Sequence, residues 1–108
     1  MTKLLSATRA VPTLCAALLL AVGPATDARA ATGTFVYDRI DGSHGRFVNP
    51  TDFVCYDFDT PALGVDNDTD TAARVFDNYG CAGVSEVVPS HTAITWGRYR
   101  AQSVRFGG

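Results

Sequence analysis

Seven short runs of β-branched and aromatic residues constrain the fold of this chain more than any other feature. Each run is three to five residues long, and no stretch after residue 31 keeps a 3.6-residue apolar period. Turn-forming segments such as "DTPALG" (59–64), "DNDTD" (66–70) and "DNYG" (77–80) separate the runs. Short strands at a spacing of about ten residues with such turns are typical of an all-β sandwich or barrel. We therefore expect one all-β domain with strands at 34–37, 46–48, 53–56, 73–76, 85–88, 92–96 and 103–106.

The first thirty residues have the pattern of an export signal. A basic start precedes an apolar run at 11–22, and "ARA" at 28–30 gives an A-x-A cleavage pattern. The apolar run is shorter than the roughly 20 residues that a membrane-spanning helix needs, which disfavours the alternative of a short anchor. A lipoprotein is disfavoured too, because Cys15 lies inside the apolar run rather than after it. We expect cleavage after Ala30, secretion, and contact with the membrane only during export.

Cleavage would leave one small domain that needs a covalent crosslink. Residues 31–108 number 108 less 30, or 78 residues. A core of that size alone contributes only about 3–5 kcal/mol. Two cysteines remain, Cys55 and Cys81, and in an oxidising compartment such a pair predicts a disulfide, with two buried free thiols as the alternative. Closing the loop between them should stabilise the domain by roughly 3.5 kcal/mol.

The charge of this domain argues against nucleic-acid binding. Residues 31–108 contain ten acidic residues, six arginines and no lysine, so the net charge is six less ten, or −4. General binding to nucleic acid needs a positive surface. The charge is unevenly distributed, however, because aspartates crowd the middle while Arg98, Arg100 and Arg105 cluster near the end.

The segment "FDNYGCAG" (76–83) has a distinctive spacing. Phe76 is followed by an apolar group five residues on, Cys81, and by a glycine seven residues on, Gly83. This spacing resembles the βγ-crystallin Greek-key motif, in which a hairpin folds back over the sheet and covers the aromatic residue. The glycine of that motif has φ > 0, which a Cβ atom opposes. "QSVRF" (102–106) resembles the later strand of the motif, whose serine, here Ser103, lies beside the folded hairpin, and "LGVDN" (63–67) resembles the same strand of the first half.

The resemblance implies a single small Greek-key β-sandwich of two similar halves. It extends to small secreted bacterial relatives, including metallopeptidase-inhibitor-like proteins, in which a cysteine in the second apolar position can be bonded to the other half of the domain. The first half departs from the motif, because Gly42 is five residues after Tyr37 while the glycine candidate Gly45 is eight residues after it. We expect the first hairpin to be longer or differently folded. An unrelated β-sandwich with coincidental spacing is the alternative.

Calcium is the metal that the resemblance implies, yet its binding motif is degenerate here. The two segments that correspond to it, 59–64 and 98–103, lack most of the acidic or amide ligands. Asp66, Asp68 and Asp70 alternate as hard-oxygen ligands can, and Asp77 falls at position twelve of an EF-hand count. The sixth position is Thr71 instead of glycine, and flanking helices are absent. These aspartates are weak candidates, a polar turn is the alternative, and we expect no cofactor.

No residue set for catalysis is apparent. The two histidines, His44 and His91, each follow a serine, but consecutive side chains of a strand point apart and cannot form a triad. Neither serine lies in a nucleophile elbow. Zinc would need more histidines or cysteines than a disulfide leaves. We expect the protein not to be an enzyme.

The segment "TWGRYR" (95–100) is the candidate binding patch. Tryptophan, tyrosine and arginine are enriched at interface hot spots. The two arginines alternate with the tyrosine, so we expect them to share one strand face. The alternative is that the tryptophan fills the core. The patch consists of Trp96, Arg98, Tyr99 and Arg100.

These observations favour a small secreted, non-enzymatic binding protein that acts as a monomer. Its expected partner is an extracellular protein such as a peptidase, which it would inhibit, because a rigid crosslinked scaffold lowers the entropic cost of ordering a binding loop. The alternatives are a calcium-stabilised structural or envelope-associated module and a toxin-like antimicrobial protein, since a fold does not determine a function.

Overall fold

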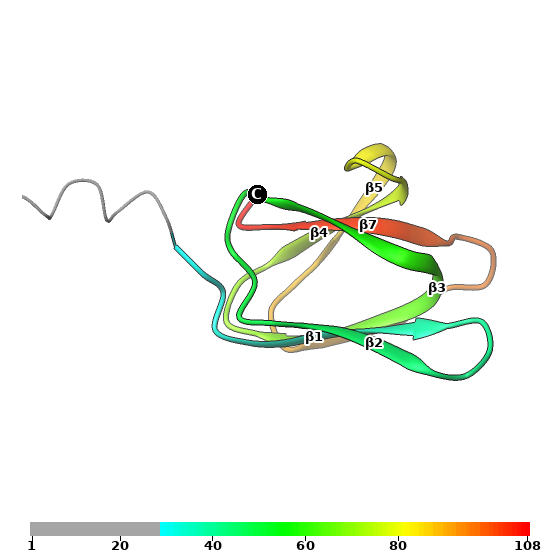
Figure 1. The fold of residues 1–108 in the computed structure, drawn as a ribbon, viewed down its shortest axis with the longest axis horizontal. Helices are drawn as coiled ribbons and strands as arrows, with labels where there is room; N and C mark the ends of the chain where they lie inside the picture. Colours follow the sequence, from blue (N-terminus) through cyan, green and yellow to red (C-terminus); the bar gives the residue numbers. More distant parts are fainter. Residues whose placement is uncertain (1–28) are drawn as a thin grey trace, which may run out of the picture.

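The computed structural model describes residues 29–108, and every regular element in this part of the chain is a strand (Figure 1). The all-β prediction is therefore confirmed. The expected export signal lies outside the described residues except for Arg29 and Ala30. Residues 29–108 contain no helix long and apolar enough to cross a membrane. The strands are β1 (Gly33–Arg39), β2 (His44–Val48), β3 (Cys55–Thr69), β4 (Ala73–Asn78), β5 (Ala82–Val88), β6 (Thr92–Thr95) and β7 (Ala101–Phe106).

The strands form one continuous antiparallel sheet that folds into two layers, because β3 belongs to both (Figure 1). Residues 55–57 of β3 pair with β7, whereas residues 62–69 pair with β1. The strand bends between these parts, where its register with β7 shifts. One layer has the order β2, β1, second part of β3, β6, and the other has the order first part of β3, β7, β4, β5.

β3 is longer than the sequence predicted. A strand at 53–56 and turns at 59–64 and 66–70 were expected, but one strand runs from Cys55 to Thr69. It begins late because Phe53 has φ 65°, outside the β region. It continues to Thr69 because the side chains of residues 62, 65, 67 and 69 are buried. Two of these buried residues, Asn67 and Thr69, are polar, so the sequence does not show the apolar and polar alternation of a strand. Pro61 lies at the bend, where the regular hydrogen bonding between β3 and β7 is already interrupted, so the missing N–H of proline is tolerated.

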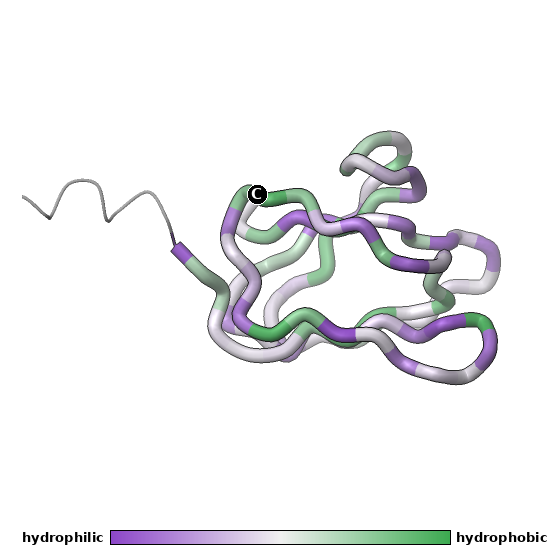
Figure 2. Tube along the Cα trace, in the orientation of Figure 1, coloured by the Kyte–Doolittle hydropathy of each residue, from purple (hydrophilic) through white to green (hydrophobic). Residues whose placement is uncertain are grey.

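Aromatic rings fill the space between the layers. The rings of Tyr37 and Phe58 stack with centroids 4.2 Å apart, and the rings of Phe35 and Phe106 meet edge to face at 5.2 Å. Figure 2 shows hydrophobic and hydrophilic residues alternating along much of the folded chain, as expected when one side of each strand faces the core. The remaining large buried side chains are Val65, Val75, Val88 and Val104.

The first hairpin has its own aromatic and glycine contact, with a spacing of eight residues. Tyr37 and Gly45 are directly paired in β1 and β2, and a Cβ atom at position 45 would lie 2.2 Å from the Tyr37 ring. The Tyr37 hydroxyl donates to Asp59 Oδ1 at 2.9 Å. The Arg39 guanidinium also binds Asp59, and this hydrogen bond lowers the pKa of the Asp59 carboxyl. The ring thus fixes the hairpin against the glycine.

A buried amide joins the end of β3 to the end of β5. Asn67 is fully buried, and its Nδ2 donates to the carbonyls of Thr71 at 2.9 Å and Val88 at 3.0 Å. Its Oδ1 accepts from Thr69 Oγ1 at 2.7 Å. Because each of these groups is shielded from water, each needs a partner within the protein. Asn67 supplies the partner for three of them.

The start of the described chain is part of the domain. Ala31 is fully buried, and its N–H donates to the Pro50 carbonyl at 2.8 Å. The Arg29 carbonyl accepts from the Asp52 N–H at 2.7 Å, and Ala30 forms a bridge with Thr51. The expected cleavage after Ala30 falls inside this contact with residues 50–52.

The Asn67 network generates a prediction. Asn67→Ala should lower the free energy of unfolding by about 1–3 kcal/mol, because it leaves buried donors and acceptors without partners. Asp66→Ala, at the adjacent exposed position of the same strand, is the matched control and should change it by less than about 0.5 kcal/mol. Urea denaturation measures both values. Equal effects of the two variants would contradict the role of the amide.

Candidate binding site at the crosslinked hairpin

The outer face of the layer formed by β3, β7, β4 and β5 carries two rows of side chains. Tyr56, Val75 and Val104 pack into or against the core, so their neighbours along each strand point outward. We call one row the covered row, and it consists of Asp57, Ser103, Phe76 and Ser85. We call the other the arginine row, and it consists of Cys55, Arg105, Arg74 and Val87.

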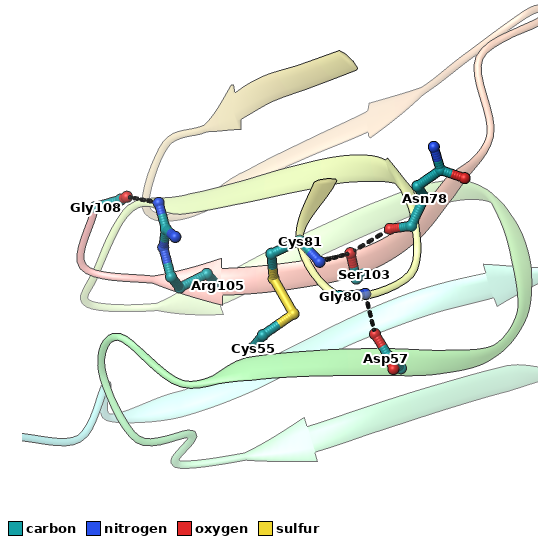
Figure 3. Close-up of a disulfide and its surroundings, with 8 residues drawn as sticks. All are labelled: Cys55, Asp57, Asn78, Gly80, Cys81, Ser103, Arg105 and Gly108. Carbon is teal, nitrogen blue, oxygen red and sulfur yellow. Dashed lines mark hydrogen bonds between the residues drawn. A yellow bond between two sulfur atoms is a disulfide. The ribbon is translucent and has the colours of Figure 1, made fainter. Parts of the chain in front are cut away.

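The hairpin between β4 and β5 folds back over the covered row (Figure 3). We call residues 78–84 the hairpin tip. A disulfide joins Cys81 of the tip to Cys55 of β3, with Cα atoms 5.9 Å apart, as unstrained disulfides require. The predicted pairing of these cysteines is confirmed. The bond links two parts of the chain that are 26 residues apart.

Hydrogen bonds with Asp57 and Ser103 fix the tip in addition to the disulfide (Figure 3). The Gly80 N–H donates to Asp57 Oδ1 at 2.8 Å. The Cys81 N–H donates to Ser103 Oγ at 3.0 Å, and the same hydroxyl donates to the Asn78 carbonyl at 2.6 Å. Ser103, which the motif singled out, therefore holds both ends of the turn from a buried position.

The backbone of the tip is left-handed at three positions. Gly80 has φ 71°, Cys81 has φ 56° and Gly83 has φ 89°. A Cβ atom at position 83 would lie 2.1 Å from Asp77 Oδ1, which accepts from the Val84 N–H at 2.8 Å. Gly83 is therefore needed both for its φ angle and for the close approach of Asp77.

The tip buries Phe76 on the outside of the sheet. Phe76 is only 7% exposed although it faces away from the core. The guanidinium of Arg105 lies over its ring, 5.6 Å from the centroid. The aromatic residue of the motif is thus covered from above, and its burial depends on the tip staying folded.

The tip presents apolar groups to solvent. Tyr79 is 50% exposed and Val84 is 64% exposed, and Ala82 and Gly83 between them are exposed as well. These groups sit on a turn that is crosslinked and hydrogen-bonded from below. A rigid, protruding apolar turn of this kind can enter a groove of another protein without losing much conformational freedom.

The predicted patch at 96–100 is a loop, so the expectation that its two arginines share a strand face is wrong. β6 ends at Thr95 and β7 begins at Ala101. Gly97 and Arg98 are exposed, while Arg100 Nη1 is bound to carbonyls of the loop itself. The backbone leaves the sheet at Trp96, and strand alternation no longer orients the side chains that follow.

The two aromatic rings of this loop support β5. The rings of Trp96 and Tyr99 meet at 5.0 Å and pack against the core. Trp96 Nε1 donates to Glu86 Oε1 at 2.9 Å, and the Tyr99 hydroxyl donates to the Val84 carbonyl at 2.6 Å. Burial raises the pKa of Tyr99 to about 12, and the carboxylates of Asp77 and Glu86 add to the shift. The rings therefore hold the tip and β5.

The candidate calcium ligands do not come together. Asp66 and Asp68 lie on the exposed side of β3, so this segment is a strand and not a polar turn. Asp68 Oδ1 contacts His91 Nδ1 at 3.1 Å, and Asp70 Oδ1 accepts from the Thr32 N–H at 2.8 Å. Asp77 is engaged at the tip. Within residues 29–108 no three His, Cys, Asp or Glu side chains gather in a group that could hold a metal ion.

The serines and histidines bind other partners. His44 contacts Asp38 at 2.8 Å, and Ser43 Oγ donates to Asp41 at 2.6 Å. Ser90 Oγ donates to the Thr69 carbonyl. Neither serine is hydrogen-bonded to its neighbouring histidine, as expected for consecutive residues.

Sequence reasoning missed Asp57, Asp77 and Tyr79. The two aspartates fix the tip through side-chain to backbone hydrogen bonds across 23 and 7 residues. No sequence pattern pointed to Asp57, because its partner, the Gly80 N–H, comes close only when the hairpin folds back over the sheet. Tyr79 had a weak signal, since a large aromatic within the turn "DNYG" is not needed for the turn itself.

Comparisons of the chain with protein-family models, with curated proteins and with solved structures found no match.

Two substitutions test the tip. Phe76→Ala should lower the free energy of unfolding by about 3 kcal/mol or more, because a large buried ring is replaced by a cavity. Gly83→Val should also be severe, since it forces a branched residue to φ 89° and into Asp77. Val87→Ala, at an exposed position of β5, is the control. Thermal melting is the measurement, and variants that melt within a degree or two of the parent would contradict the fold-back.

Tyr99 predicts an alkaline loss of stability. The folded state keeps the Tyr99 proton to about pH 12, whereas an unfolded tyrosine loses it near pH 10. Between these values the unfolded state binds fewer protons, so stability falls as the pH rises. The free energy of unfolding of the parent should decline more steeply from pH 9 to pH 11 than that of Tyr99→Phe. Tyr79→Phe should follow the parent, and parallel declines in all three would refute the assignment.

Proposed function

We propose that this chain is a small exported, non-enzymatic binding protein with a βγ-crystallin-like Greek-key fold, and that its partner is an extracellular peptidase, which it inhibits. The observation that carries the proposal is the hairpin tip. It is held by a disulfide and by hydrogen bonds to Asp57 and Ser103, yet it exposes half of Tyr79.

The strand order supports the Greek-key part of the proposal. In a Greek key, the fourth strand returns to lie beside the first. The second part of β3 lies beside β1, and β7 lies beside β4. In the first half, the third segment is the first part of β3, which pairs with β7 in the other layer. In the second half, the third segment is β6, which pairs with the second part of β3 in the other layer. The meeting of Phe76, Gly83 and Ser103 at the fold-back supports the crystallin-like assignment further.

The disulfide supports export. Cys55 is exposed and Cys81 is half-buried, so reductants can reach the bond. An exposed structural disulfide persists in an oxidising compartment and is rare where thiols are kept reduced. This agrees with the export pattern of the first thirty residues and with secretion of the domain.

The energetics of inhibition follow from the rigidity of the tip. A flexible loop loses side-chain and backbone freedom when it enters an active-site groove, and that cost weakens binding. The tip is already ordered, so burial of Tyr79 and Val84 contributes more fully to affinity. Tyrosine is a frequent hot-spot residue, because it brings a large contact area with few rotatable bonds.

The test is a titration of the oxidised protein against a panel of secreted metallo- and serine peptidases. We expect inhibition at micromolar concentration or below of at least one of them. Tyr79→Ala should weaken it about tenfold or more without changing the melting temperature. Ile40→Ala, on the exposed turn of the other hairpin, is the matched control and should inhibit as the parent does. Absence of inhibition by the parent at micromolar levels would overturn the proposal.

A further inference from the structure

The arginine row contains two like charges in direct opposition. Arg74 of β4 and Arg105 of β7 are paired in register. The Cβ atoms of such cross-strand neighbours lie about 5 Å apart, and like charges at these positions destabilise a sheet. In a domain whose net charge is negative, this placement is not explained by a general excess of cations.

Neither arginine forms an ion pair with an aspartate or glutamate side chain within residues 29–108. The arginine–carboxylate pair in this part of the chain joins Arg39 to Asp59. Arg74 Nη1 donates to Ser85 Oγ at 3.0 Å. Arg105 Nη2 donates to the main-chain oxygen of Gly108 at 3.0 Å (Figure 3). Neither of these bonds uses a side-chain carboxylate, and most of the five N–H donors of each guanidinium stay available.

The surface around the pair is open and partly apolar. The hairpin tip covers the adjacent row and leaves the arginine row beyond Cys55 open, with Val87 45% exposed. A hollow of about 100 Å³ lies beside Arg74, lined by Ala72, Ala73, Val87 and Gly108. Small-molecule sites are about 300–1,000 Å³, so the hollow suits a single side chain better than a cofactor.

The edge next to Val87 is open to a further strand. β5 is the last strand of its layer and, in the described chain, pairs only with β4. Sheet edges are normally protected by short length, charge or proline. β5 has seven residues and one charged side chain, Glu86, which is already bound by Trp96. By comparison, the edge strand β2 carries Arg46, and the edge strand β6 has four residues.

We propose that an acidic, extended segment of a partner protein adds to the edge of β5 along 85–88 and binds Arg74 and Arg105 through its carboxylates. A residue opposite Val87 on the added strand would extend the arginine row, because alternate side chains of neighbouring strands share a face. A glutamate there reaches over Val87 to Arg74. Backbone hydrogen bonds supply affinity and the arginines supply the preference for acidic sequences.

Charge complementarity selects this occupant. A nucleic acid would bring many phosphates against a domain of net charge −4 with only two arginines on this face. A polypeptide with two or three carboxylates matches the number of free cations. The proposal does not rest on peptidase inhibition, since it uses the β5 edge and the arginine row instead of Tyr79.

The probe is the peptide acetyl-Val-Glu-Val-Glu-Val-amide, with its glutamine analogue as the uncharged comparison. In ¹⁵N spectra of the oxidised protein at constant ionic strength, the acidic peptide should shift the amides of 85–88 and the Nε–H signals of Arg74 and Arg105. The glutamine analogue should bind about tenfold more weakly. Higher salt should weaken the acidic peptide alone.

Two double variants separate this site from net charge. R74Q/R105Q should weaken the acidic peptide about tenfold, because its carboxylates lose both cationic partners. R46Q/R98Q changes the net charge equally and should bind within about twofold of the parent. If R74Q/R105Q fails to fold, R74Q alone serves, with R46Q as its control.

Several results would overturn the proposal. Equal binding of the two peptides would remove the role of the arginines. Shifts centred on β2 or β6 would place the added strand elsewhere. Shifts of the arginine signals by inorganic sulfate as large as those by the peptide, with no change at 85–88, would indicate a simple anion site without strand addition.

Discussion

The bond between Cys55 and Cys81 is the constraint on which the other features depend. It holds the hairpin tip against the outer face of β3 and β7, and the hydrogen bonds to Asp57 and Ser103 act at the same place. Its expected contribution of roughly 3.5 kcal/mol is comparable to the whole core contribution of a domain this small. Because the tip is closed, Phe76 is buried outside the core and Tyr79 is displayed at a fixed position.

Two groups of aromatic residues serve different purposes. Tyr37, Phe58, Phe35 and Phe106 fill the space between the layers. Trp96 and Tyr99 lie at the margin of that core, where their polar atoms bind Glu86 and the Val84 carbonyl. They fix β5 from within, while the disulfide fixes the tip that leads into it. The exposed edge of β5 is thus a rigid surface, which favours recognition of a partner over local unfolding.

The sequence predicted the elements whose inward side chains are apolar and missed those whose inward side chains are polar. The strands around "FVY", "RVF" and "VRF" and the cysteine pair were found from alternation and cysteine count. β3 was divided in error, because Asn67 and Thr69 point inward and "DNDTD" has the composition of a turn. The contacts of Asp57 and Asp77, and the opposition of Arg74 and Arg105, depend on strand register between distant segments, which single-sequence patterns do not specify.

The position of β7 sets the order in which the molecule can be built. β7 lies between the first part of β3 and β4, so it is the central strand of its layer although residues 101–106 are made after all the other strands. Until it emerges, residues 55–57 and β4 have no common partner, and Ser103 is missing from beneath the tip. The turn that carries Cys81 therefore gains its support from Ser103 only after β7 has been made. A chain that ends before β7 lacks the strand that joins the first part of β3 to β4, so this layer can close only when the last strand is present.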